Sequence, residues 1–182
     1  MEYCKTIRLK DGRDCILRSA GKADAQAVYD SFNLIHGETE YLLSYSDENS
    51  FDVSQEASFL EEKRQSEYEV ELCAVVDDRI VGTAGIEMVG TKAKVKHRAE
   101  FGISIEKAYW GLGIGKGLTL ACIECARRSG YSQVELNVVS TNESAISLYK
   151  SVGFVEYGRN PKGFRTRSGA WQELVLMRLE LS

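Results

Sequence analysis

A cluster of glycines between residues 111 and 117 is the first feature of this sequence that suggests chemistry. It lies between a strand-like run and an amphipathic helical pattern. Glycine lets the backbone approach a ligand closely, and the first N–H groups of a helix lack intrahelical partners and carry positive potential. The cluster therefore predicts a site for an anion, most naturally a pyrophosphate.

Two common nucleotide-binding motifs do not fit this cluster. A Walker A loop needs glycine at its first position and Ser or Thr at its last, where this chain has Trp110 and Gly117. A Rossmann GxGxxG fingerprint fails as well, because its last position falls on Lys116 or Leu118. Glycines that only make a tight turn remain the alternative.

A second stretch runs from Asn142 to Phe154 and has helical spacing. Ala145, Leu148 and Val152 recur on one face and are expected to point inward. Asn142 lies near the expected helix start, where its amide either caps the helix or binds a ligand. Tyr149 borders the apolar stripe and is either a half-buried aromatic or a functional residue.

In this order and at this separation, the two stretches resemble motifs A and B of the GNAT superfamily of N-acetyltransferases. Motif A, (Gln/Arg)-x-x-Gly-x-(Gly/Ala), is matched over residues 110–115, with Trp110 in place of the usual Gln or Arg. Motif B, NxxAxxLYxxxGF, is matched at every position over residues 142–154. The resemblance implies an α/β fold with a mixed, mostly antiparallel sheet of about seven strands and helices on both faces. It also implies acetyl-CoA as cosubstrate.

The resemblance carries roles onto particular residues. The cofactor-binding residues it implies are Ile103, Ser104, Ile105, Trp110, Gly111, Leu112, Gly113, Ile114, Gly115, Lys116, Gly117, Asn142, Ala145 and Tyr149. A neutral amine would attack the thioester carbonyl directly, and a backbone N–H of residues 103–105 would stabilise the oxyanion. Tyr149 would protonate the leaving thiolate. Glu100 is the candidate base; the alternative is a surface Glu100 with water carrying the proton.

The acceptor is an unidentified primary amine of a small molecule, peptide or protein N-terminus. Residues 38–71 hold eleven acids and two bases, a net charge of −9, whereas the whole chain has −4. This acidic segment is either a solvated face or a surface that attracts a cationic acceptor. The basic residues Arg159, Lys162, Arg165 and Arg167, on an expected loop 159–168, indicate instead an anionic partner, and the two hints conflict.

Two classes of protein compete with the enzyme. One is a non-catalytic acyl-CoA sensor, which the presence of Tyr149 and the glycines disfavours. The other is a nucleotide-binding regulatory domain, which the failed fingerprints disfavour. Many GNAT proteins form dimers, so a homodimer is an expectation from the family.

The composition bears on the partners of the protein and on its location in the cell. The negative net charge argues against nucleic acid as a partner. The N-terminus has no apolar signal segment, and no run reaches the roughly 18–20 apolar residues of a membrane span, so we expect a cytoplasmic protein without membrane contact. Cys122 and Cys125 form a CxxC within a helical pattern and are expected to be core residues. No metal site is predicted.

The remaining pattern predicts one domain over residues 1–182. Expected strands cover residues 3–9, 14–18, 70–76, 79–88, 95–105, 134–139, 154–157 and 173–181. Expected helices cover residues 23–36, 54–66, 114–129 and 142–152, with Gly37 as a stop for the first. Residues 38–53 are expected to be irregular.

Overall fold

The computed structural model describes residues 1–181, and all eight of their strands join one sheet. The strands are β1 (Cys4–Arg8), β2 (Asp14–Ser19), β3 (Val70–Val76), β4 (Arg79–Met88), β5 (Arg98–Ile105), β6 (Gln133–Val139), β7 (Val155–Arg165) and β8 (Trp171–Glu180). Their order across the sheet is β1-β2-β3-β4-β5-β6-β8-β7. The expected mixed, mostly antiparallel sheet is confirmed, with eight strands where about seven were predicted.

Tight turns connect the antiparallel pairs. Asp77 and Asp78 join β3 to β4 with φ values of 50° and 60°, the left-handed conformation of a two-residue hairpin turn whose twist matches that of the strands. Gly12, between β1 and β2, has φ 88°. Both turns lie between strands that the sequence predicts.

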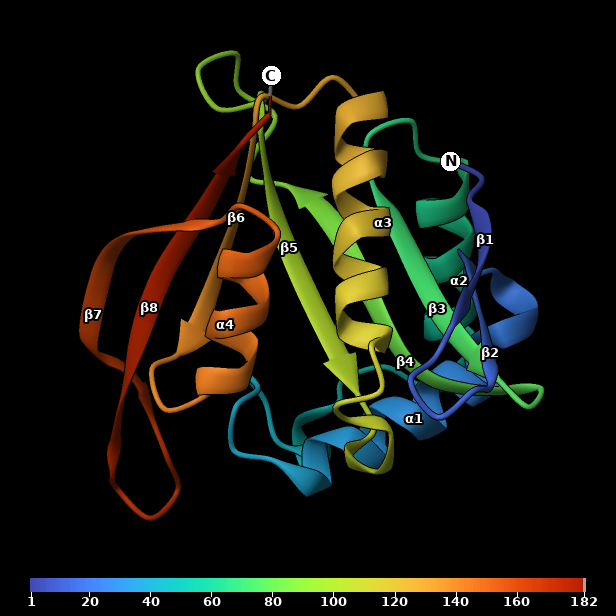
Figure 1. Ribbon diagram of the computed structural model, residues 1–182, viewed down its shortest axis with the longest axis horizontal. Coiled ribbons are helices and arrows are strands. Elements are labelled where there is room, and N and C mark those ends of the chain that lie inside the picture. The colour runs from blue at the N-terminus through green and yellow to red at the C-terminus, as the bar shows by residue number, and fades with distance from the viewer. Residues whose placement is uncertain (182) are drawn as a thin grey trace.

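Helices cover both faces of the sheet (Figure 1). The helices α3 (Ile114–Arg128) and α4 (Glu143–Ser151) pack on one face, and α1 (Ala25–Glu38) and α2 (Val53–Gln65) pack on the other. The larger apolar core lies under α3, where Leu118, Cys122 and Cys125 are buried against the sheet. A smaller core under α1 and α2 centres on Leu60 and Cys73.

Strand alternation decides what each helix layer meets. On β3, Leu72 and Ala74 belong to the core under α3, whereas Cys73 belongs to the core under α1 and α2. Successive side chains of a strand point to opposite faces. Glu71 therefore lies on the face of α1 and α2, and the register places Gly85 of β4 beside it and Gly102 of β5 beside Gly85.

The only parallel pairing among the described strands is also the shortest. β5 and β6 pair over three residues, from Arg98↔Gln133 to Glu100↔Glu135, and Arg98 forms a salt bridge with Glu135 at this closed end. Beyond Glu100 the two strands diverge, with α4 near the opening (Figure 1). The sheet therefore contains a V-shaped gap between β5 and β6.

Four predictions about element boundaries were wrong. The expected loop 159–168 lies mostly within β7. Pro161 and Gly163 sit where the register with β8 shifts, between Asn160 and Phe164. β7 is an edge strand, and edge strands tolerate proline. The strand expected over 154–157 is thus eleven residues long. β5 begins at Arg98 rather than residue 95, and α1 continues through Gly37 to Glu38.

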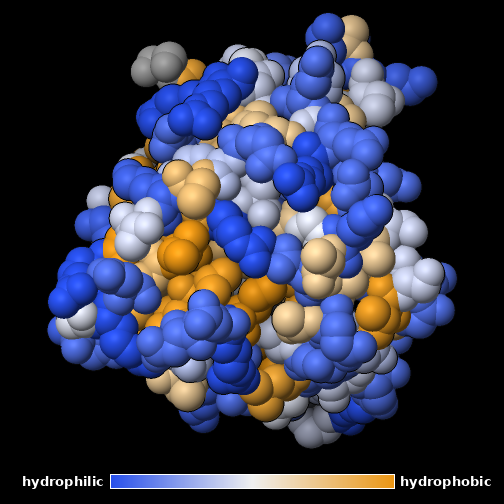
Figure 2. All heavy atoms as spheres, turned by 90° about the vertical axis from the view of Figure 1, so that its right-hand side faces the viewer, coloured by the Kyte–Doolittle hydropathy of each residue, from blue (hydrophilic) through white to orange (hydrophobic). Residues whose placement is uncertain are grey.

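The outer surface is largely polar. Figure 2 looks at the side on which β1, β2, α1 and α2 lie and shows hydrophobic residues gathered in its middle, surrounded by hydrophilic ones. No helix of the described residues is long and apolar enough to cross a membrane.

Candidate active site

The glycine cluster forms the turn that leads into α3. Gly111 and Gly113 have φ values of 77° and 103°, a left-handed conformation that only glycine adopts readily. A Cβ at either position would meet nothing within 4 Å. Glycine is therefore required by the backbone conformation, and the space above the turn is open.

The start of α3 offers three unpaired backbone donors. The first helical hydrogen bond runs from the Gly117 N–H to the Gly113 carbonyl at 3.0 Å, so the N–H groups of Ile114, Gly115 and Lys116 precede the intrahelical ladder. Gly117, which was also expected to bind the cofactor, has its N–H already used in this bond, and a Cβ there would lie 2.6 Å from Ile7 Cδ1. Gly117 allows α3 to pack closely on the sheet.

The edge of β5 that faces the gap exposes further donors. The Val89 N–H donates to the Arg98 carbonyl, and the Glu106 N–H donates to the Val81 carbonyl. Along an antiparallel ladder every second residue of β5 bonds to β4, so the even-numbered residues face β4. The N–H groups of Ile103 and Ile105 therefore point away from β4. Both residues lie beyond the last β5–β6 pair. The indole N–H of Trp110 donates to the Ile105 carbonyl at 2.7 Å, which agrees with this orientation.

Tyr149 lies on α4, where its ring packs between two aromatic rings. The Phe101 and Phe154 centroids are 6.1 Å and 5.8 Å from that of Tyr149. The residue is 7% exposed, and burial raises the pKa of its hydroxyl above the ordinary value. Tyr149 therefore stays protonated at neutral pH, as a proton donor must.

Asn142 caps α4, which was one of the two roles left open for it. Its side-chain oxygen accepts a hydrogen bond from the Ala145 N–H at 3.3 Å. This bond satisfies one of the free donors of the first turn. The cap fixes the start of the helix that carries Tyr149.

A pocket of about 590 Å³ opens on the other face of the sheet. Its floor is β3, β4 and β5, and its walls are α1, α2 and residues 42–51 between them. Gly85 and Gly102 lie side by side in the floor, and a Cβ on Gly102 would meet nothing within 4 Å. Two adjacent strands thus leave the middle of the floor without side chains.

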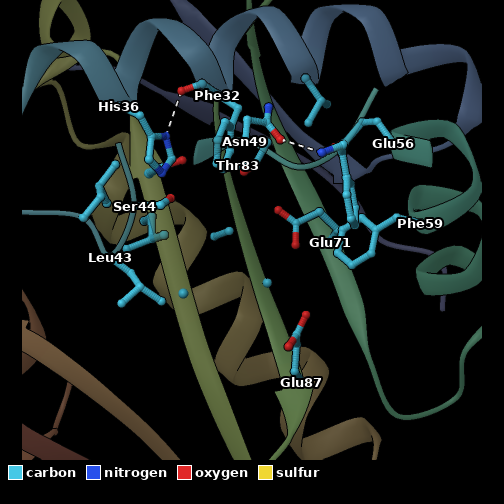
Figure 3. A pocket seen from close by; sticks show the side chains of 18 of the residues that line it. Phe32, His36, Leu43, Ser44, Asn49, Glu56, Phe59, Glu71, Thr83 and Glu87 are labelled. Carbon is cyan, nitrogen blue, oxygen red and sulfur yellow. Dashed lines mark hydrogen bonds between the residues drawn. The ribbon is translucent and has the colours of Figure 1, made fainter. Parts of the chain in front are cut away.

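Glutamates dominate the charged lining of this pocket. The described lining residues include five glutamates and no lysine or arginine: Glu48, Glu56, Glu71, Glu87 and Glu100. Figure 3 shows the Glu71 and Glu87 carboxyl groups pointing into the same space, with Phe59 beside Glu71 and His36 reaching in from α1. Burial lowers the pKa of His36, so its ring is neutral at pH 7 and does not offset the acids.

Only part of this negative charge is balanced by the protein. Glu87 contacts Lys63 at 2.8 Å and Glu48 contacts Arg167 at 3.6 Å. Among the described residues, Glu56, Glu71 and Glu100 have no ion pair. Glu100 lies directly opposite Glu87 across β4 and β5, an arrangement of like charges that is unfavourable without a cation between them.

Glu71 lies across the glycine floor. A Cβ on Gly85 would fall 2.2 Å from Glu71 Oε2, so the carboxyl group is directly above Gly85. Burial raises the pKa of Glu71 to about 7; a Thr83 hydrogen bond and Lys63 lower it, and Glu87 and Glu56 raise it further. The folded protein thus retains this proton at a pH where the unfolded chain has lost it.

We expect Glu71→Gln to stabilise the protein at pH 8 and to leave it unchanged at pH 4. Because the folded-state pKa of Glu71 lies above the ordinary 4.5, its ionisation destabilises the fold as the pH rises from about 4.5 to about 7. Glutamine mimics the protonated acid and avoids this cost. Melting curves should show a gain of roughly 2–8 °C at pH 8, and an equal gain at both pH values would contradict the assignment.

The basic side chains of residues 159–168 form ion pairs and aromatic contacts within the protein. Arg167 lies over the Tyr45 ring at 4.1 Å and forms a 2.6 Å salt bridge with Asp47. Arg159 pairs with Glu156 and Glu173, and Arg165 stacks on Trp171. The hairpin of β7 and β8 thus fastens the acidic segment, and none of these basic residues lines the pocket.

The expected residues therefore fall into three groups. Residues 103–105, 110–116 and 149 surround the gap and the start of α3, and Glu100 faces the pocket. Asn142, Ala145 and Gly117 have structural contacts. In the sequence, Glu56 and Glu71 are only two of the eleven acids of residues 38–71, and Glu87 lies outside that segment. The available signal for Glu71 was its spacing from Cys73. Residues two apart in a strand share a face, so Glu71 lies on the same face of β3 as Cys73.

The cysteines agree with their expected place. Cys122 and Cys125 are 1% and 0% exposed on the inner face of α3, and both are free thiols. Within residues 1–181, no group of three His, Cys, Asp or Glu side chains is placed to hold a metal ion.

The profile of the Acetyltransferase (GNAT) family matches residues 28–154. The chain belongs to this family. It is an acyl-CoA-dependent acetyltransferase, as the two motifs predict. The matched segment includes the glycine turn, the gap between β5 and β6, and Tyr149.

Relatives agree with this assignment. The chain is 25% identical over 165 residues to the L-amino acid N-acyltransferase MnaT of Escherichia coli, a match covering 91% of this chain and 93% of that enzyme. Relatives differ in length: a 36% identical match to protein ML0378 of Mycobacterium leprae covers 57% of this chain but 27% of that protein.

Solved structures show the same fold. A GNAT acetyltransferase from Streptococcus pneumoniae superposes with a TM-score of 0.88 at 27% identity, covering 92% of this chain and 99% of the other. A putative acetyltransferase from Salmonella typhimurium, solved with its cofactor acetyl-CoA, has a TM-score of 0.82 at 24% identity, with coverage of 92% and 94%.

Proposed function

We propose that this enzyme transfers the acetyl group of acetyl-CoA to a primary amine bound in the acidic pocket. The observation that carries the proposal is the V-shaped gap between β5 and β6, which joins the donor turn of α3 on one side to the glutamate-lined pocket on the other. The Salmonella structure with acetyl-CoA supports the donor, and the unbalanced glutamates support a cationic acceptor.

The donor site uses backbone groups. The N–H groups of Ile114, Gly115 and Lys116 would hold the pyrophosphate at the positive end of α3. The pantetheine arm would pass through the gap beside β5. The pairing of β5 with β6 ends at Glu100, so the Ile103 N–H has no partner on β6. This N–H would donate to the thioester oxygen and stabilise its negative charge during attack.

The proton transfers use groups on opposite faces of the sheet. Glu100, on the pocket face, takes one proton from the substrate ammonium and passes it to solvent. The neutral amine attacks the carbonyl carbon, the C–N bond forms, and the C–S bond breaks. Tyr149, on the α4 face, gives its proton to the sulfur and regains one from the amide nitrogen as the intermediate collapses. The products are an amide, free CoA and one released proton.

Incubation with acetyl-CoA and a panel of amines tests this proposal. The panel holds amino acids, N-terminal peptides, diamines and aminoglycosides, and products are read by mass spectrometry. We expect acetylated products among the cationic members and none without enzyme. If acetyl-CoA stabilises the protein in melting curves but no amine is acetylated, the non-catalytic acyl-CoA sensor becomes the better account.

A further inference from the structure

We propose that the pocket binds acceptors with two amino groups: Glu71 and Glu56 hold a second ammonium while the first reacts near Glu100. The inference rests on the proposed function and assigns its substrate class as short, flexible diamines. It follows from which carboxylates the protein leaves without a cation, and from where they lie relative to the gap.

Glu56 is the observation that separates this cluster from an ordinary acidic surface. It lies on α2, lines the pocket, and is 8% exposed. Its carboxylate has no hydrogen bond or ion pair to another described residue, and burial alone raises its pKa. An unpartnered buried carboxylate is costly, so a cationic ligand is the group that would balance it.

Glu71 provides the second carboxylate of the same site. Its carboxyl group lies over Gly85, one strand away from Gly102 and thus about 5 Å from the β5 backbone. Lys63 does not neutralise it, because the Lys63 amino group is held by Glu69 and Glu87, each at 2.8 Å. Glu71 and Glu56 therefore remain available to a ligand.

The geometry separates the two ends of the ligand. Glu100 and the Ile103 N–H lie at β5, where the acetyl group would arrive, whereas the Glu71 carboxyl group lies over Gly85 of β4, one strand away. The space above Gly102, where a Cβ would meet nothing within 4 Å, connects them. Phe51 and Phe59, with ring centroids 5.8 Å apart, line the pocket and offer contacts to an alkyl chain and to its ammonium group.

Charge also distinguishes the two amines. The amine near Glu100 must lose a proton before it attacks, whereas the amine near Glu71 and Glu56 keeps its proton and its charge. A monoamine of the same length would leave both of these carboxylates unpaired. The pocket should therefore discriminate by the second charge.

Equilibrium binding tests this inference independently of turnover. We would titrate 1,4-diaminobutane and n-butylamine by calorimetry into the full-length protein saturated with CoA, at pH 8. The wild type should bind the diamine at least tenfold more tightly than the monoamine. Glu71→Gln should remove most of this preference, and Glu62→Gln, a matched loss of charge on α2 outside the pocket lining, should keep it.

Each result separates the inference from the proposed function. Equal affinities for the two amines in the wild type would overturn the diamine site, as would an unchanged preference in Glu71→Gln. If monoamines and diamines are also acetylated equally well, the acetyltransferase stands without the second site. If the diamine binds preferentially but is not acetylated, the site stands and the proposed reaction fails.

Discussion

Tyr149→Phe should lower kcat roughly 10- to 100-fold and leave the KM for acetyl-CoA nearly unchanged. A tenfold loss corresponds to about 1.4 kcal/mol of barrier, and positioned general acids contribute about a hundredfold or more. The change removes only the hydroxyl, so the ring contacts with Phe101 and Phe154 remain. The loss should therefore appear in the chemical step rather than in binding or folding.

The matched control for this variant is Tyr157→Phe. Tyr157 lies on β7, is 46% exposed, and does not line the pocket. It should keep wild-type kcat. Because burial raises the pKa of Tyr149, the wild-type rate should not fall through Tyr149 ionisation below about pH 10. A Tyr149→Phe enzyme with wild-type kcat would assign the protonation of the thiolate to water.

Gly113→Val should abolish detectable stabilisation by acetyl-CoA, a loss of about a hundredfold or more in affinity. Gly113 has φ 103°, and a left-handed conformation costs other residues about 1–2 kcal/mol or more. A β-branched residue would force the turn to rearrange and would misdirect the N–H groups at the start of α3. Melting curves with increasing acetyl-CoA measure the effect, since a ligand that binds the folded state raises the melting temperature.

Gly169→Val separates this effect from simple strain. Gly169 lies in the turn between β7 and β8, has φ 92°, and a Cβ there would also meet nothing within 4 Å. The two variants thus impose similar backbone strain at different sites. Gly169→Val should lose stability but keep the full shift with acetyl-CoA. Equal shifts in both variants would show that the turn before α3 does not bind the cofactor.

The glycine turn before α3 and the cap of α4 could be predicted because their signals are local. Residues 110–115 and 142–154 each combine glycine or cap positions with one helical pattern, and local geometry follows from such short stretches. The structure adds what sequence spacing does not contain, such as the packing role of Gly117 against Ile7 and the contact between Trp110 and Ile105.

Apart from Glu100, the acceptor side could be predicted only as an excess of charge. Glu56, Glu71 and Glu87 come from three different elements, and only the pairing of β3 with β4 and the packing of α2 bring them together. The conflicting basic residues are explained in the same way, because the long β7–β8 hairpin carries Arg167 to Asp47. Such contacts depend on tertiary structure, which no local pattern encodes.

A crystal structure with acetyl-CoA would test the central claim most directly. We predict that the pyrophosphate lies on the N–H groups of residues 114–116, that the pantetheine arm lies between β5 and β6, and that the thioester oxygen meets the Ile103 N–H with the sulfur beside Tyr149. The acetyl carbon should then face the pocket that holds Glu100. Acetyl-CoA bound elsewhere, with the gap between β5 and β6 unused, would contradict the account.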